Sequence, residues 1–208
     1  MKILALDFST PNASLALMED GRLLAELAVD AGHRRSQELF AAVESLLLRA
    51  GWQFGDLDAY AVGCGPGSYA GLRVSLTAAN GWALPEKKTV WAVPSPAALA
   101  AELFAEAPEL RFVVISGNAR RGTLWAGCFQ RDGQLLARQV DDWRLLPADG
   151  SRAGEWPGVS WADAGRVPRA EWVGRLFFTG RVSQPLQPIY LHPAVSIPPR
   201  FDAAGRPI

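Results

Sequence analysis

Apolar residues in the first half of the chain follow two patterns: short continuous runs, and longer segments in which they recur at helical spacing. The short runs predict strands over residues 2–6, 13–18, 22–29, 59–62 and 90–93. Helices are predicted from helical spacing of apolar side chains and from a Ser-Pro helix start, over residues 36–50, 72–84 and 95–105. Three strands followed by alternating helices and strands indicate an α/β protein.

The pattern begins again beyond Pro108. Further strands and one helix are predicted over residues 112–115, 123–129, 134–140 and 170–178. Residues 147–169, rich in Gly, Pro and Trp, are expected to be irregular, and so is the tail of residues 185–207, which holds six prolines. We therefore predict an N-terminal lobe over residues 1–106 and a smaller C-terminal lobe over residues 107–208.

Composition narrows the possible function classes. The 21 basic and 21 acidic side chains cancel, which argues against a stand-alone nucleic-acid binder. Cys64 and Cys128 lie far apart without Cys-x-x-Cys spacing, so neither a zinc site nor a disulfide framework is predicted. Because Asp7 interrupts the first apolar run and no stretch is long enough to cross a bilayer, we expect a soluble, cytoplasmic protein.

A glycine-rich turn at residues 63–71 follows the strand at residues 59–62 and leads into the next helix. Such a turn can cradle a phosphate with its backbone N–H groups, although no lysine follows it as in a Walker A loop. It can also be a tight strand-to-helix turn whose glycines let two helices pack closely. We favour the packing interpretation.

The turn after the first strand carries Asp7, Ser9 and Thr10. In a nucleotide-binding protein these side chains would handle metal and phosphate, whereas in an ordinary turn they hydrogen-bond to nearby backbone. Residues 116–122 are similarly either a degenerate second phosphate loop or a turn between strands. The sequence has two histidines, His33 and His192, and we assign neither a chemical role.

Several segments resemble the family of bacterial TsaB (YeaZ) proteins. The main ones are residues 3–17, 36–47 and 65–74, and weaker matches occur at residues 118–125 and 188–191. The resemblance implies the actin-like architecture shared with Hsp70 and sugar kinases, built from two ribonuclease-H-like lobes. It also implies a subunit of the complex that makes threonylcarbamoyladenosine on tRNA, in which TsaD is the catalytic partner.

The resemblance further implies that the TsaD relatives hold a metal with a His-x-x-x-His pair, on the helix after the strand that here ends at Val93. This chain has Pro94-Ser95-Pro96-Ala97-Ala98-Leu99 in that place. Iron or zinc needs several donor atoms that converge on one point. We therefore predict no metal site, no catalytic residues and a non-catalytic scaffold subunit.

In the resembled family, the first two helices form the face that meets TsaD or a second copy of the chain. The resemblance therefore implies an interface at Leu39, Phe40, Val43, Gly67, Ser68, Gly71, Leu72, Arg73 and Leu76. A bulky side chain at Gly71 is expected to abolish pairing and leave the isolated chain able to fold. The implied further partners are the P-loop ATPase TsaE and, through the complex, tRNA. No cofactor is expected other than ATP or ADP at the shared interface.

The alternative function is an ATP-binding kinase or ATPase of the actin-like class that acts on a small molecule. Asp7, Ser9 and Thr10 would then contact phosphate and metal. A peptidase is disfavoured because neither a metal-binding pair nor a Ser–His–Asp set can be assembled from the sequence. Nucleotide with Mg²⁺ should stabilise a kinase by mass action, which distinguishes it from a scaffold.

Overall fold

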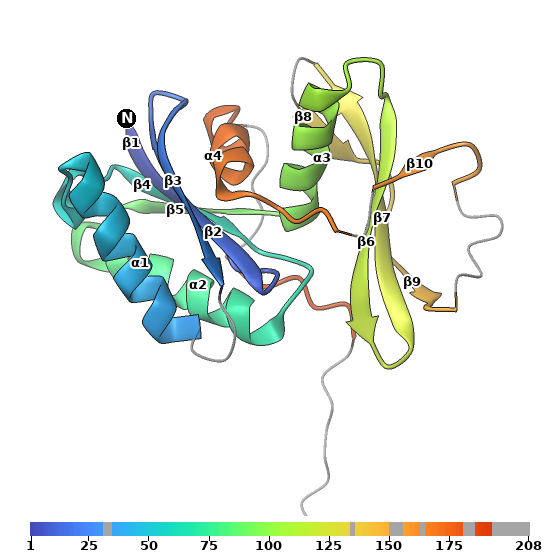
Figure 1. Cartoon of the computed structure of the whole chain (residues 1–208), viewed down its shortest axis with the longest axis horizontal. Helices are drawn as coiled ribbons and strands as arrows, with labels where there is room; N and C mark the ends of the chain where they lie inside the picture. The colour runs from blue at the N-terminus through green and yellow to red at the C-terminus, as the bar shows by residue number, and fades with distance from the viewer. Residues whose placement is uncertain (31–34, 134–135, 150–155, 163–164, 181–185, 193–208) are drawn as a thin grey trace, which may run out of the picture.

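Two β-sheets with two helices between them form the framework of the protein (Figure 1). The computed structural model describes residues 1–30, 35–133, 136–149, 156–162, 165–180 and 186–192. Within these ranges, no helix is both long and apolar enough to cross a membrane.

The first sheet contains three antiparallel strands followed by two parallel ones. Its strands are β1 (Lys2–Asp7), β2 (Asn12–Glu19), β3 (Arg22–Asp30), β4 (Ala59–Gly63) and β5 (Thr89–Val93). They lie in the order β3-β2-β1-β4-β5, and both β4 and β5 run parallel to β1. Because both faces of this sheet are covered, residues 3–7 of β1 are all buried, which explains the continuous apolar run of residues 3–6.

Helices cover the two faces of the first sheet. On one face lie α1 (Arg35–Ala50) and α2 (Tyr69–Ala83), and on the other lies α4 (Ala170–Phe178) (Figure 1). Alternate residues of β1 serve the two faces, since successive side chains of a strand point to opposite sides. Leu4 and Leu6 join the apolar cluster under α1 and α2, whereas Ile3 and Ala5 join the cluster under α4.

The second sheet repeats part of the first. Its strands are β6 (Phe112–Arg120), β7 (Thr123–Asp132), β8 (Leu136–Gln139), β9 (Arg144–Pro147) and β10 (Ser160–Trp161). The antiparallel strands β6, β7 and β8 are followed by β10, which runs parallel to β6, while β9 pairs with the end of β7. The order β8-β7-β6-β10 thus corresponds to β3-β2-β1-β4. Two sheets of this order confirm the predicted α/β, actin-like fold class.

The helices between the sheets join the two halves of the chain. Helix α3 (Ser95–Glu106) packs on β6, β7 and β8, and α4 packs on β1 and β2. At their junction Arg169 pairs with Glu26 of β3, with Glu102 of α3 at 3.0 Å and with Glu171 of α4 at 3.0 Å. The lobe division at residues 106 and 107 stays a prediction, but α4 comes from the second half and covers the first sheet.

Several predicted boundaries differ from the structure. Helix α2 begins at Tyr69 rather than at residue 72, because the Ser68 hydroxyl accepts a hydrogen bond from the Gly71 N–H and caps the helix there. Strand β6 continues to Arg120, so most of residues 116–122 is strand and only Arg121 and Gly122 separate it from β7. Two short 3-10 turns, Phe54–Asp56 and Leu84–Glu86, were not predicted.

Other predictions fall partly or wholly outside the described residues. His33 lies there, as do residues 134 and 135 of the strand predicted over 134–140, whose remainder contains β8. The predicted irregular tail is described only over residues 186–192, and these have no helix or strand.

Candidate functional site

The glycine-rich turn after β4 packs directly on the turn after β1. Of the four glycines in residues 63–71, three lie against residues 7–9. A Cβ atom would collide with the Asp7 carboxylate at Gly63, the Ser9 carbonyl at Gly67 and the Phe8 carbonyl at Gly71. The Ser68 N–H also donates a hydrogen bond to the Ser9 carbonyl at 2.7 Å. The glycines therefore permit close packing, but of a turn on a turn rather than of two helices.

The side chains predicted for nucleotide binding are engaged in their own turn. Asp7 is buried, and its Oδ1 accepts hydrogen bonds from the N–H and the hydroxyl of Ser9 at 2.9 and 2.6 Å. Burial raises the pKa of the Asp7 carboxyl, although hydrogen bonds from Ser9 and Ser95 act in the opposite direction. The Thr10 hydroxyl donates to the Asn12 carbonyl at 2.9 Å. This is the local arrangement of a polar turn, and the nucleotide role stays a prediction.

A cavity of about 370 Å³ lies between this turn and the second sheet. It is lined by Ser9 and Thr10 on one side and by residues 115–118 of β6 on the other. In the described part of the chain, no group of three or more His, Cys, Asp or Glu side chains could hold a metal ion. Burial raises the pKa of the nearby Cys64 thiol to about 12, so this cysteine is not a nucleophile at neutral pH.

An apolar groove of about 530 Å³ runs between α1 and α2 on the outside of the protein. Phe40 of α1 forms one wall and is 47% exposed. Its ring meets the Trp82 ring edge-on, with 5.6 Å between centroids. The rest of the lining comes from α2: Arg73, Val74, Thr77, Ala78, Gly81 and Trp82. We call this surface the helix groove.

The structure divides the nine predicted interface residues between the core and the surface. Leu39, Val43, Gly71, Leu72 and Leu76 are buried inside the chain, whereas Phe40, Gly67 and Arg73 are exposed and Ser68 is half-buried. The expectation for Gly71 is wrong, because any side chain there would collide with the Phe8 carbonyl and disturb the fold itself. Ala78, Gly81 and Trp82 were considered from the sequence as residues of the pairing face, and they line the groove. Sequence reasoning missed Val74 and Thr77, although they follow the helical period on the side away from Leu72 and Leu76.

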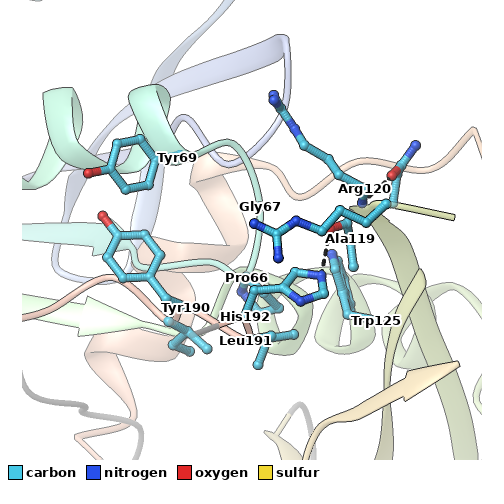
Figure 2. A pocket seen from close by; sticks show the side chains of 12 residues that line it. Pro66, Gly67, Tyr69, Ala119, Arg120, Trp125, Tyr190, Leu191 and His192 are labelled. Atoms are coloured by element: carbon cyan, nitrogen blue, oxygen red, sulfur yellow. Dashed lines mark hydrogen bonds between the residues drawn. The ribbon is translucent and has the colours of Figure 1, made fainter. Parts of the chain in front are cut away.

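A second surface cavity, of about 550 Å³, lies where the described tail meets the β6–β7 hairpin (Figure 2). We call it the tail cavity; its lining is Pro66, Gly67, Tyr69, residues 118–121, Trp125 and residues 189–192. His192, which we had assigned no role, has its Nε2 2.9 Å from the Ala119 carbonyl oxygen. The Ile189 N–H donates to the Cys64 carbonyl at 2.8 Å, so the tail is bonded to both sides of the cavity.

Comparison with known proteins places the chain in a family. Residues 29–144 match the model of the family TsaD, tRNA N6-adenosine threonylcarbamoyltransferase. This match covers more than half of the 208 residues, and the chain belongs to that family.

Within the family, the chain is similar to proteins named TsaB and YeaZ. The tRNA threonylcarbamoyladenosine biosynthesis protein TsaB of Bacillus subtilis is 31% identical over 153 residues, which cover 72% of this chain and 64% of that protein. TsaB of Escherichia coli is 27% identical over 177 residues, covering 80% of this chain and 76% of that protein. The solved structure of YeaZ from Pseudomonas aeruginosa superimposes with a TM-score of 0.78 at 27% identity, covering 91% of this chain and 99% of that one. The resemblance predicted from the sequence is confirmed.

Proposed function

We propose that this chain is a non-catalytic subunit in the synthesis of threonylcarbamoyladenosine on tRNA, and that it binds a TsaD protein through the helix groove. The observation that carries the proposal is the exposed apolar groove, on the two helices that the family resemblance implies for pairing. Relatives named as threonylcarbamoyladenosine biosynthesis proteins TsaB support the pathway. TsaE and tRNA would join through the assembled complex in the cytoplasm.

The helix groove has the chemistry of a protein interface. Aromatic side chains are enriched among the residues that dominate binding energy, and Phe40 and Trp82 supply two adjoining rings. Gly81 leaves open space beside them, since a Cβ atom there would meet nothing within 4 Å. A helix of the partner could therefore approach the backbone of α2 closely. A second copy of this chain is the alternative occupant in the absence of TsaD.

The non-catalytic role rests on the sequence at the start of α3. The helix begins Ser95-Pro96-Ala97-Ala98-Leu99, where the resemblance implies a histidine pair in the metal-bearing TsaD relatives. The partner would supply the metal and transfer the threonylcarbamoyl group to adenosine. This chain would hold the partner in its productive arrangement, with ATP or ADP at the shared interface.

Size-exclusion chromatography with light scattering would test the pairing, using the purified chain and TsaD from the same genome, with and without ATP. We expect one heteromeric species. Gly81→Arg should abolish it while preserving the circular dichroism spectrum, because the groove has room for the side chain but not for a partner as well. Gly165→Arg is the matched control, since Gly165 is exposed, has open space beside it and lies far from the groove in sequence.

The two possible failures have different meanings. If the chain and TsaD elute separately under every condition, the proposed partner is wrong. If Gly81→Arg pairs as tightly as the unaltered chain, the partner is right and the helix groove is not the interface.

A kinase or ATPase is the second candidate, favoured by the position of Ser9 and Thr10 at the cavity of about 370 Å³. Binding to the folded state alone raises stability by mass action, by roughly 2.7 kcal/mol at a ligand concentration 100 times Kd. Millimolar ATP with Mg²⁺ should then raise the Tm by several degrees. An unchanged Tm would remove this candidate.

A further inference from the structure

The tail cavity carries local positive charge on a chain whose formal net charge is zero. Arg120 and Arg121 line it, and no Asp or Glu does. Both arginines are exposed, and neither forms an ion pair with a described residue. By contrast, Arg166 and Arg169 are held by glutamates. Two guanidinium groups at one cavity, with no carboxylate partner in the described part of the chain, favour an anionic ligand, and the planar fork of arginine suits phosphate in particular.

The same cavity is rich in aromatic rings. Tyr69 of α2 and Tyr190 of the tail stack with 5.2 Å between centroids and 28° between their planes. Figure 2 shows this pair on one side of the cavity, Arg120 and Trp125 on the other, and His192 between them. Tyrosine and tryptophan rings offer flat apolar faces together with a polar atom, which is the chemistry that binds a nucleic-acid base by stacking.

The backbone of the hairpin is shaped to present the arginines. Arg120 and Arg121 have φ values of +65° and +52°, a region that residues other than glycine rarely adopt. The β6–β7 register shifts between Asn118 and Arg120, and the Asn118 Oδ1 accepts a hydrogen bond from the Arg120 N–H at 2.6 Å. Such a bulge re-aims the side chains around it.

The bulge also anchors the tail. Ala119, within the shifted register, offers its carbonyl oxygen to His192 Nε2 at 2.9 Å, and the Thr123 hydroxyl lies 3.4 Å from the same nitrogen. The tail wall of the cavity is therefore tied to the hairpin that carries the arginines.

We propose that the tail cavity binds a nucleotide, with the phosphate at Arg120 and Arg121 and the base against the aromatic side chains. Its volume of about 550 Å³ lies within the usual range for small-ligand sites. The nucleotide can be free or part of a single-stranded RNA, because phosphate pairing and base stacking serve both. Asp7, Ser9 and Thr10 do not line the tail cavity, which adjoins the cavity of about 370 Å³ and shares five lining residues with it: Pro66, Gly67, Asn118, Arg120 and Trp125. The proposal does not depend on the helix groove or on any partner protein.

Isothermal titration calorimetry on the full chain alone tests the proposal with four probes: AMP, adenosine, ribose 5-phosphate and a single-stranded hexaribonucleotide. We expect saturable binding of AMP, and binding about tenfold weaker or absent for adenosine and ribose 5-phosphate, because each lacks half of the recognised chemistry. Arg120→Ala and Arg121→Ala should each weaken AMP binding by about tenfold, and Tyr190→Leu by several-fold. Arg49→Ala, an exposed arginine in the last turn of α1, should leave binding unchanged.

The RNA arm identifies the source of the nucleotide. A hexaribonucleotide that binds more tightly than AMP, with the same dependence on Arg120 and Arg121, indicates RNA; AMP binding as tight or tighter indicates a free nucleotide. The proposal is overturned if neither probe binds saturably up to millimolar concentration. It is equally overturned if both arginine variants bind AMP as the unaltered chain does. A failure here leaves the pairing with TsaD untouched, since that experiment uses another surface and another readout.

Discussion

The two faces of α2 carry similar residue types but have different roles: one face packs in the core, and the other lines the helix groove. The inner face holds Gly71, which lies against the turn after β1, and Leu72 and Leu76, which are buried in the apolar cluster beneath α1 and α2. The outer face holds Gly81 and Trp82, which line the helix groove. Leu72 has no exposed surface, whereas its neighbour Arg73 is exposed. Burial rather than residue type therefore separates the core of this helix from its binding surface.

The two glycines of α2 illustrate the difference most clearly. Gly71 is required because the Phe8 carbonyl occupies the place of a Cβ atom, whereas Gly81 has nothing within 4 Å of that place. The first glycine serves folding, and the second leaves room for another molecule. Substitutions on the two faces should accordingly change different measured quantities.

The largest expected effect is on the inner face. Leu72→Ala should lower the free energy of unfolding by about 3 kcal/mol, because it removes a fully buried side chain and leaves a cavity. Arg73→Ala, one residue on, should change it by less than about 0.5 kcal/mol. Urea unfolding followed by circular dichroism measures both. Equal effects at the two positions would contradict the division into faces.

Gly71→Ala should come next, with a loss of about 2 kcal/mol in the free energy of unfolding. The added methyl group collides with a backbone oxygen, which cannot rotate away as a side chain can. The same urea titration measures it. A variant as stable as the parent chain would show that the backbone of the turn after β1 can shift at little cost in free energy.

Gly81→Ala should have a smaller effect of the opposite sign. Alanine is favoured over glycine inside a helix by about 1 kcal/mol, and the open space beside Gly81 imposes no penalty. Thermal unfolding should therefore show a raised Tm. A lowered Tm would mean that the outer face is packed more tightly than the structure indicates.

The last prediction concerns Asp7, the buried carboxyl at the end of β1, and how it makes the stability of the protein depend on pH. The pKa of Asp7 is raised from its ordinary 3.8, so the folded chain holds this proton more strongly than the unfolded chain does. Asp7 should therefore make the protein less stable as pH rises from about 4 through its folded pKa, with no further change above it. Urea unfolding between pH 4 and 7 should show this slope, and Asp7→Asn should flatten it. An identical slope in both proteins would exclude Asp7 as its source.

Local patterns were good predictors of elements and poor predictors of contacts. The apolar stripe at residues 39–47 identified α1, because helical spacing is visible within a few turns. The antiparallel meander of the first three strands was predicted from the Asp-Gly hairpin signal and is confirmed. The parallel pairing of β4 with β1 was not argued from the residues, because it joins segments more than fifty residues apart. The length of β6 was underestimated for a related reason: Ser116 to Arg120 is polar and becomes strand only through pairing with β7.

For the candidate sites, too, the sequence identified single segments but not the contacts between segments. The glycine turn and the Asp7 turn were each found in the sequence, but their contact with each other was not. Phe40 and Arg73 were placed at the interface, yet the sequence could not separate them from buried Leu39 and Leu72. The tail cavity escaped prediction, because Tyr69, Arg120 and His192 come from three distant segments and form no motif.

The amino-acid sequence by itself determined the helices and strands of the first half, the absence of a histidine pair at the start of α3 and the resemblance to TsaB. These properties follow from short-range spacing and from residue identity, which no fold can alter. Only the tertiary structure decided which face of α2 is buried, which of its glycines has open space beside it, and that two arginines with no ion pair among the described residues meet a tyrosine pair at the tail. Burial and charge pairing depend on which residues lie close together in space, and these neighbours are established only when the chain folds.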